Sequence, residues 1–356
     1  MAMKVSVLNL FAFILLRNLI VSRGARLFSP SSAISWNDLT AGDSAWVLDS
    51  TARAAAGIIL VSQDGVGDTT TVQAAVDQVP RGNNDRVKIL ISPGFYREKV
   101  LVPFAKPYIS FIGKDNAKTV IWYNSKADDE DFNGQPVGTY NSATVAVESD
   151  YFCANAITFQ NTARSAKPGE EGKQAVALRL TGQRSVIYRC RIMAAQDTLF
   201  DHWGTHYFLE SFVQGSIDFI FGSGRSLYEK CHLNSIAESY GAVAASQRNN
   251  ITDNVGFSFV KSKLTGTGSV YLGRAWGKYA TVVYSHCQLE NIIIPGGWSD
   301  LNDENRRSTA FFGEYNCNGD GANLNGRVPW AKSLTYEQAK PYLGKKFIDG
   351  DQWLNL

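Results

Sequence analysis

The sequence predicts an all-β protein built as a parallel β-helix, a solenoid in which short strands stack coil upon coil. Runs of four to eight residues, rich in Val, Ile, Phe and Tyr and bounded by Gly, Asn, Asp or Ser, follow one another from Ile58 onward, which is typical of strands. Few runs are joined by Asn-Gly or Asp-Gly pairs, which argues against a meander of hairpins. Similar contexts recur around Cys190, Ser211 and Cys231, at separations of 21 and 20 residues, a period typical of repeat architectures.

The elements can be placed in order along the chain. The first strands after Ile58 are predicted at residues 87–91, 108–113, 119–123, 143–147 and 156–162, and further runs follow at 175–180, 185–192, 206–213, 226–233, 257–264 and 281–289. One segment, Val72 to Val79, instead carries apolar residues at helical spacing. A solenoid coil cannot bury its apolar face alone, so we expect this short helix to cap the N-terminal coil.

Composition and charge limit the domain organisation and the partners. The 356 residues are 44% hydrophobic and carry a net charge of +2, which leaves no basic stripe for nucleic acid. Residues 1–25 resemble a signal peptide: Lys4 precedes an apolar run from Val5 to Leu16, and Arg17 makes that run too short to span a membrane comfortably. An uncleaved anchor and a buried amphipathic segment are the alternatives.

The rest of the chain divides into a lead-in, residues 26–57, with no structure predicted, and a catalytic β-helix domain, residues 58–356. The sequon Asn250-Ile251-Thr252 fits a secreted glycoprotein. Five cysteines leave an odd one unpaired. A disulfide scaffold is therefore not expected, and buried free thiols are the simpler interpretation.

Two aspartates and two glutamines recur at the solenoid period. Gln174 and Gln196 are 22 residues apart, and Asp197 and Asp218 are 21 apart, so each pair is predicted to lie on neighbouring coils about 4.8 Å apart. Two crowded carboxylates divide into one protonated and one ionised group, while two carboxamides can donate to an oxyanion. Turn-forming aspartates and a structural glutamine ladder remain the alternative for any one of them.

Asp218 lies inside the apolar run Ile217 to Phe221, where an unpaired charge is costly. Arg274 is the candidate partner, since a guanidinium can hold a carboxylate with two parallel hydrogen bonds.

Five segments resemble the signature segments of plant pectin methylesterases: GFYREKV (94–100), QAVALR (174–179), QDTL (196–199), SIDFIFG (216–222) and LGRAW (272–276). The resemblance covers about residues 58–350. It implies a right-handed parallel β-helix and secretion to the plant cell wall. The inhibitor-like pro-region that precedes many members has no counterpart before residue 58, so the chain resembles the short type.

The resemblance also implies roles for the clustered residues. Asp218 is expected to attack the ester carbonyl of a galacturonate unit, Gln174 and Gln196 to stabilise the oxyanion, Asp197 to act as acid and then base, and Arg274 to orient Asp218.

For substrate binding the same resemblance implies Thr139, Phe219 and Trp276, together with Gln174 and Arg274. The expected partner is pectin, methylesterified homogalacturonan, and a proteinaceous pectinesterase inhibitor is a further partner that the resemblance suggests. The mature chain is expected to be a monomer without membrane or nucleic-acid contacts, and no cofactor or metal is implied.

Two positions depart from the family pattern. Ser211 stands where many members have cysteine, which removes a bridge from Cys190, and Ala275 stands where others have proline, a change expected to loosen the loop. The segment between Asn161 and Gln174 looks longer than usual.

The sequence supports other functions less well than the esterase. No G-x-S-x-G elbow supports a serine hydrolase, and the four histidines form no metal motif. A retaining β-helix glycosidase of pectin would also use carboxylates about 5 Å apart. An inactive pectin-binding homologue is the alternative outside the enzymes.

Overall fold

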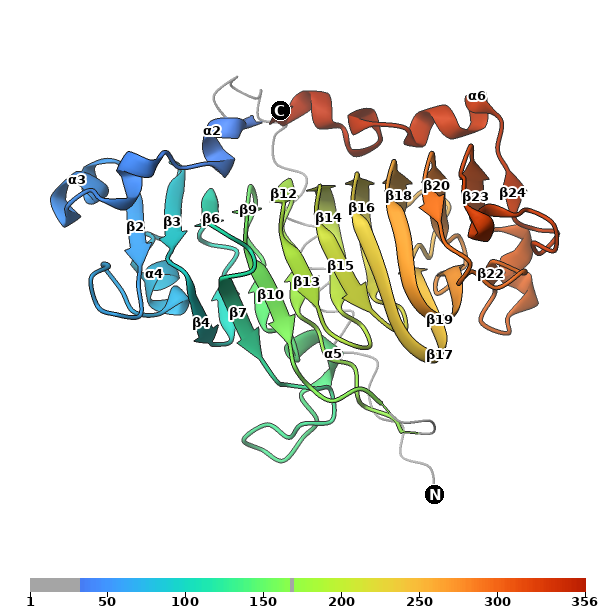
Figure 1. The fold of residues 1–356 in the computed structure, drawn as a ribbon, viewed down its shortest axis with the longest axis horizontal. Helices are drawn as coiled ribbons and strands as arrows, with labels where there is room; N and C mark the ends of the chain where they lie inside the picture. Colours follow the sequence, from blue (N-terminus) through green and yellow to red (C-terminus); the bar gives the residue numbers. More distant parts are fainter. Residues whose placement is uncertain (1–32, 167–169) are drawn as a thin grey trace. The chain divides into compact units, whose positions relative to one another are not determined.

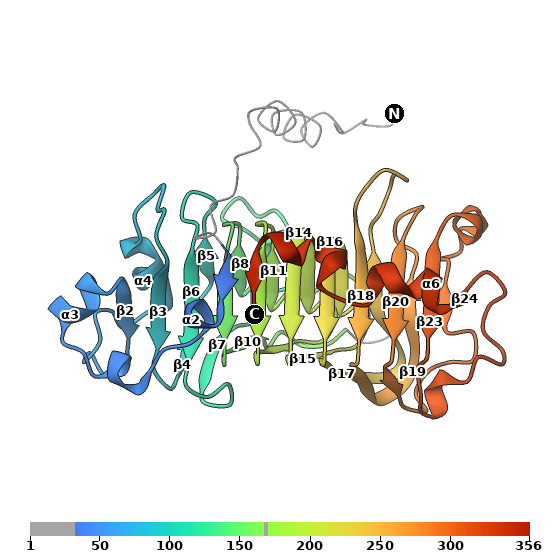
Figure 2. The ribbon, with the colours of Figure 1, turned by 90° about the horizontal axis from the view of Figure 1, so that it is seen from above.

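Within the described residues, 33–166 and 170–356 of a computed structural model, all strands except β1 and β25 form three parallel ladders that stack coil upon coil in sequence order (Figures 1 and 2). The first ladder contains β2 (Ile58–Val61), β3 (Val87–Ile91), β6 (Ile109–Gly113), β9 (Cys153–Asn155), β12 (Ser185–Tyr188), the C-terminal parts of β14 (Leu199–Leu209) and β16 (Ile220–Glu229), β18 (Gly256–Val260), β20 (Thr281–Ser285), β23 (Phe311–Tyr315) and β24 (Lys332–Ser333).

The second ladder contains β4 (Gly94–Arg97), β7 (Thr119–Tyr123), β10 (Thr158–Asn161), β13 (Arg191–Met193), β15 (Phe212–Gly215), the N-terminal parts of β17 (His232–Ser246) and β19 (Lys263–Arg274), and β21 (Gln288–Leu289). The third contains β5 (Val100–Val102), β8 (Val145–Val147), β11 (Leu178–Leu180), the N-terminal parts of β14 and β16, the C-terminal parts of β17 and β19, and β22 (Trp298–Ser299). The predicted parallel β-helix is confirmed.

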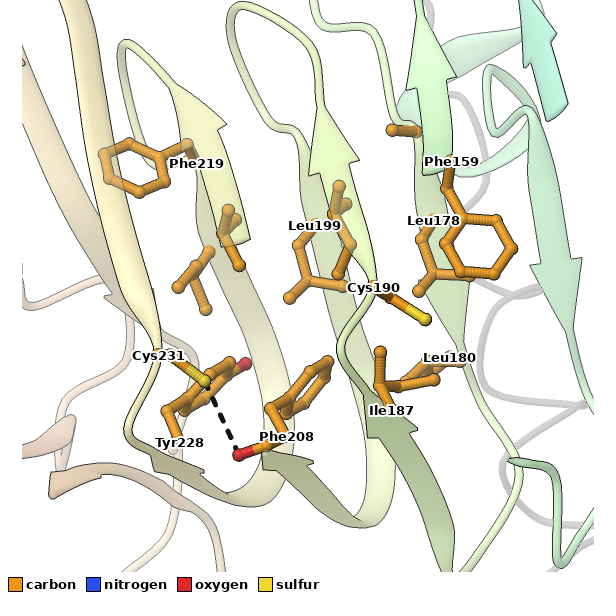
Figure 3. Packing of buried hydrophobic residues seen from close by; sticks show 14 of the residues in the cluster. Phe159, Leu178, Leu180, Ile187, Cys190, Leu199, Phe208, Phe219, Tyr228 and Cys231 are labelled. Carbon is orange, nitrogen blue, oxygen red and sulfur yellow. Dashed lines mark hydrogen bonds between the residues drawn. The ribbon is translucent and has the colours of Figure 1, made fainter. Parts of the chain in front are cut away.

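The interior of the solenoid is apolar from the first coil to the last. One buried cluster extends from Val61 to Phe312. Aromatic rings stack inside it on successive coils, with centroids 4.4 Å apart for Phe208 and Tyr228 and 4.5 Å apart for Phe259 and Tyr284. Figure 3 shows this packing for the central coils. Because the coils stack at the strand spacing, each coil buries the apolar face of the next coil. A single coil could not bury its own apolar face.

The predicted capping helix is confirmed as α4 (Val72–Gln78), whose buried residues Val72, Ala75 and Val76 join the same core. The side chain of Thr71 accepts a hydrogen bond from the Ala74 amide at 3.2 Å, which satisfies one free donor of the first turn. The helix ends before Pro80, since proline disfavours helical backbone in the residue that precedes it.

The two ends of the described chain meet on the outside of the first ladder. β1 (Ile34–Ser35) pairs with β25 (Leu354–Asn355), and α2 (Trp36–Leu39) lies beside them. The C-terminal segment, with α6 (Tyr336–Ala339) and 3-10 turns at Lys340–Tyr342, Lys345–Ile348 and Gly350–Gln352, runs back across the coils (Figures 1 and 2). We call residues 34–39 and 336–356 the terminal clasp.

Other short helices are α3 (Ser50–Ala55), α5 (Gly138–Asn141) and the 3-10 turns Asp43–Trp46, Glu304–Ser308 and Asp320–Ala322. None of the helices in the described ranges is long and apolar enough to cross a membrane. The predicted signal peptide, residues 1–25, lies outside the described residues.

Candidate active site

Asp197 and Asp218 occupy equivalent corners of neighbouring coils, where the chain passes from the second ladder to the third. The Asp197 amide donates to the Ile217 carbonyl at 3.1 Å, the hydrogen bond expected between parallel strands when Asp197 lies opposite Asp218. Both residues have left-handed backbone, with φ of 61° and 46°, a conformation that aspartate tolerates better than most residues. The corner is tight: a Cβ atom on Gly215 would lie 2.2 Å from the Cβ of Phe219.

The two glutamines lie on adjacent coils as the spacing predicts. The Ala175 amide donates to the Gln196 carbonyl at 3.1 Å, which by the same pattern sets Gln174 opposite Gln196. The side chain of Gln196 also hydrogen-bonds Asp197. One coil thus supplies Gln174, the next supplies Gln196 with Asp197, and the third supplies Asp218.

Arg274, at the end of β19, holds Asp218 through two hydrogen bonds. Its Nε donates to Oδ1 at 2.7 Å, and its Nη2 donates to Oδ2. The side chains are 19% and 15% exposed, so water screens the pair only in part. Burial by itself would lower the pKa of Arg274, but hydrogen bonding and charge from Asp218 outweigh it and raise that pKa. The bidentate contact orients the carboxyl group of Asp218 and places a positive charge beside it.

The surroundings of Asp197 favour its protonated form. Burial, and then the negative charge of Asp218, raise the pKa of Asp197 well above its ordinary value, against smaller opposing effects of Arg274 and the Gln196 hydrogen bond. The two aspartates therefore have different surroundings: Asp218 is hydrogen-bonded by Arg274, whereas Asp197 is buried and its raised pKa favours the protonated form.

Phe219 does not line the groove as expected. Its side chain is fully buried and belongs to the apolar core of the solenoid, and Figure 3 shows it among the packed interior residues. Asp218 has left-handed backbone at the corner just before β16, and both Phe219 and Ile220, which follow it, turn into the apolar core. The expectation that Phe219 contacts substrate was wrong for this reason.

The outward face of the third ladder has an aromatic floor that the sequence analysis missed. Phe200 and Phe221 stack with centroids 4.3 Å apart, and the ring of Trp276, 38% exposed, lies 6.1 Å from Phe221. Tyr140 packs edge-on against Phe200 at 6.2 Å. The signal was available, because Phe200 and Phe221 repeat the 21-residue spacing of the two aspartates.

Thr139 and Trp276 have different placements around this floor. Trp276 presents a partly exposed ring beside Phe221. Thr139 lies in α5 next to Tyr140, and its carbonyl accepts a hydrogen bond from the Ser142 hydroxyl at 2.8 Å. Tyr140 is the residue of α5 that packs over the floor, and the Arg179 guanidinium lies 3.6 Å from the centre of its ring.

Behind the floor lies a buried polar cluster that the histidine count did not reveal. Asp201 accepts a hydrogen bond from the Tyr228 hydroxyl at 2.6 Å and contacts His206 Nδ1 at 2.6 Å. His206 Nε2 lies 2.8 Å from the Gly182 carbonyl.

A cleft of about 500 Å³ continues from Trp276 and is lined by Lys278, Arg306 and polar residues between 249 and 309. A second cleft, of about 360 Å³, lies at a different corner around Lys230, Lys261 and His286, and none of the candidate catalytic residues lines it. Among the described residues, no group of three or more His, Cys, Asp or Glu side chains is arranged to hold a metal ion.

The two departures from the family pattern have structural compensation. The Ala275 amide donates to the Ser299 carbonyl at 2.8 Å, a hydrogen bond that proline cannot make, so alanine ties this loop to the next coil rather than loosening it. Ser211 Oγ accepts from the Cys190 amide at 3.1 Å and so occupies the place where a bridge would otherwise lie.

The chain belongs to the pectinesterase family: the family model described as Pectinesterase matches residues 58–351. It is accordingly a carboxylic ester hydrolase.

Individual relatives agree with this assignment. Pectinesterase QRT1 of Arabidopsis thaliana is 54% identical over 301 residues, which are 84% of this chain and 79% of the relative. Among solved structures, the pectin methylesterase from carrot superposes with a TM-score of 0.77 at 34% identity, over 83% of this chain and 94% of the carrot chain. The Aspergillus niger pectin methylesterase gives a TM-score of 0.71 at 26% identity, over 83% and 95%.

Proposed function

We propose that this chain hydrolyses the methyl esters of homogalacturonan, with Asp218 as nucleophile, Asp197 as acid and base, and Gln174 and Gln196 as oxyanion donors. The observation that carries the proposal is the different state of the two aspartates: Arg274 holds Asp218 in two hydrogen bonds, while the raised pKa of Asp197 favours its protonated form. The names of the pectin methylesterase relatives supply the ester and the polymer.

In the first half-reaction an oxygen of Asp218 attacks the ester carbonyl at C6 of a galacturonate unit. The carbonyl oxygen becomes negative, and the side-chain amides of Gln174 and Gln196 donate hydrogen bonds to it. The bond to the methoxy oxygen breaks as Asp197 gives that oxygen its proton. Methanol leaves, and the sugar remains joined to Asp218 as an acyl-enzyme.

In the second half-reaction Asp197, now a carboxylate, takes a proton from water, and the resulting hydroxide attacks the acyl carbonyl. Asp218 leaves as a carboxylate that Arg274 again stabilises, and Asp197 ends protonated. One residue serves as acid and then as base, and the balance is ester plus water to methanol and galacturonic acid, which then releases its proton to solvent.

Substrate binding in this proposal relies on the aromatic floor. Trp276 offers a partly exposed ring for stacking on a sugar, and Tyr140 supplies an aromatic wall on the other side of Phe200. Thr139 is a further candidate contact by its position in α5. Lys278, in the cleft beyond Trp276, suits the carboxylates of units that have already lost their methyl groups, whereas Arg306 in the same cleft is paired with Asp303.

We also propose secretion to the plant cell wall, where this polymer resides, by way of the predicted signal peptide. Asn250 is exposed in the loop after β17, which makes the sequon accessible for glycosylation. We further propose that the secreted chain is a monomer and that a protein inhibitor of pectinesterases binds it.

The proposal is tested by measuring methanol and new reducing ends released from highly methylated pectin. The wild type is expected to release methanol without new reducing ends, and Asp218→Asn to release neither while keeping the wild-type circular dichroism spectrum. Asp351→Asn, an exposed carboxylate in the terminal clasp, is the matched control and should keep full activity. Methanol release by Asp218→Asn would refute the nucleophile.

The remaining outcomes separate the alternatives. New reducing ends from the wild type would favour the retaining glycosidase. Binding of pectin by the wild type without either product would favour the inactive homologue.

A further inference from the structure

The corner between the first and second ladders carries an inward-facing column of small side chains, one for each coil. In order along the stack they are Cys190, Ser211, Cys231, Ser262, Cys287 and Cys317. Each immediately precedes a residue of the second ladder whose pairing is in register from coil to coil: Arg191, Phe212, His232, Lys263, Gln288 and Asn318. We call these six residues the corner column.

Cysteine and serine alternate along the corner column until its C-terminal end. Ser211 accepts a hydrogen bond from the Cys190 amide at 3.1 Å, and Ser262 accepts one from the Cys231 amide at 3.0 Å. The first cysteines of the column therefore have serines as neighbours on the next coil. Within the described residues of this column, Cys287 and Cys317 are the one place where two cysteines occupy adjacent coils.

The backbone holds these two residues side by side. The Asn318 amide donates to the Cys287 carbonyl, and the His286 amide donates to the Tyr315 carbonyl, both at 2.9 Å. Neighbouring strand positions lie about 4.8 Å apart, within the range of about 4.4 to 6.8 Å between Cα atoms that disulfides span. The two thiols already hydrogen-bond each other.

The two thiols differ in access. Cys287 is buried, whereas Cys317 is partly exposed. The hydrogen bond from Cys287 lowers the pKa of the Cys317 thiol, and burial opposes that effect. Because the thiolate is the reactive form, Cys317 is the sulfur that an external oxidant reaches first.

We propose that Cys287 and Cys317 form a disulfide between neighbouring coils when the chain meets a disulfide oxidant, such as an oxidoreductase of the secretory route or oxidised glutathione. The Cys317 thiolate attacks one sulfur of the oxidant and releases the other as a thiolate. The Cys287 thiol loses its proton and attacks the Cys317 sulfur, which expels the second thiol of the oxidant. Two protein thiols are oxidised and one disulfide is reduced.

The bond would tie the coil that follows β23 to the coil before it, ahead of β24 and the terminal clasp. A cross-link stabilises a protein mainly by restricting its unfolded chain. The melting temperature of the oxidised protein should therefore exceed that of the reduced protein by several degrees. The pair lies away from the aspartates, so the rate of methanol release is expected to be the same in both forms.

The test uses the purified full chain, equilibrated with oxidised glutathione or with dithiothreitol, then unfolded and alkylated with iodoacetamide. The oxidised protein is expected to show three alkylated cysteines, Cys153, Cys190 and Cys231, and a peptide pair linked through Cys287 and Cys317. The reduced protein should show five. Five alkylated cysteines after oxidation, or a linked peptide that contains Cys153, Cys190 or Cys231, would overturn the proposal.

Two serine variants make the result specific. Cys317→Ser should leave four alkylated cysteines under both conditions and a melting temperature that no longer depends on the oxidant. Cys231→Ser, which changes the same column one step away, should keep the linked peptide and the redox-dependent melting temperature. A redox-dependent melting temperature in Cys317→Ser would contradict the assignment. Neither readout requires catalysis, so this test is independent of the proposed reaction.

Discussion

Asp197 makes the stability of the protein depend on pH in a direction that can be checked. Its pKa is raised in the folded state, first by burial and then by Asp218, above the value of about 3.9 expected in the unfolded chain. The stability that its protonated form contributes is fully present below about pH 4 and is lost as the pH rises toward the folded pKa. The amide side chain in the variant Asp197→Asn does not titrate, so the variant does not lose stability in this way. As the pH rises from 4 to 7, the melting temperature of the variant should therefore increase by a few degrees relative to that of the wild type. A difference that stays constant over this range would contradict the raised pKa.

The glutamine pair predicts a kinetic effect of known size. Gln174→Ala removes one proposed oxyanion donor, and kcat should fall by about 10²- to 10³-fold. KM should change little, because the negative oxygen exists only in the transition state and intermediates. Steady-state methanol release measures both parameters. Gln352→Ala, an exposed glutamine in the terminal clasp, is the control, and an equal loss in that variant would show that the effect is not local to the site.

At the scale of single elements, the capping helix α4 depends on its first turn. Thr71→Ala removes the acceptor for the Ala74 amide and should lower the free energy of unfolding by about 1 kcal/mol, measured by urea denaturation. Thr71→Ser keeps the acceptor and should stay near the wild type. Thr70→Ala, an exposed neighbour, should change stability by less than about 0.5 kcal/mol, and a loss as large as that of Thr71→Ala would refute the capping role.

Elements that are governed by local pattern were predictable from the sequence. The strands at 87–91 and 119–123 match β3 and β7 to the residue, and α4 falls on the helical pattern. The long strands β14 and β17 were predicted only in part, because each bends round a corner and joins two ladders. Such a bend depends on contacts with the neighbouring coils, and the local pattern of apolar and polar residues carries no information about these contacts.

The candidate site shows the same division. The solenoid period predicted that the two aspartates lie on neighbouring coils, as do the two glutamines. The cost of burying an unpaired charge predicted that Arg274 pairs with Asp218. Phe219 was predicted to contact substrate, but the backbone corner at Asp218 directs its side chain into the core. The sequence motif does not record this direction. Tyr140 was missed because α5 reaches the aromatic floor through an excursion of the chain, with no repeat to mark it.

For the molecule as a whole, the terminal clasp joins distant parts of the sequence. Trp353 is 1% exposed, and its indole nitrogen donates to the Ile348 carbonyl at 2.8 Å. Its cluster also contains Ile34 and Leu39 from the start of the described chain and residues such as Val186 and Leu227 from the middle coils. Since β1 pairs with β25, loosening the C-terminal end also frees the N-terminal segment.

Trp353→Ala should therefore destabilise the molecule far beyond its last few residues. Deleting a buried indole costs about 3–5 kcal/mol, and urea denaturation should show a midpoint lowered accordingly, with limited proteolysis cutting near residues 34–39 as well as near the C-terminus. Phe132→Ala, which removes an aromatic ring that is 97% exposed, should stay within about 0.5 kcal/mol of the wild type. If Trp353→Ala behaved like Phe132→Ala, or if cleavage stayed confined to the C-terminal end, the clasp would not couple the two ends of the chain through the solenoid.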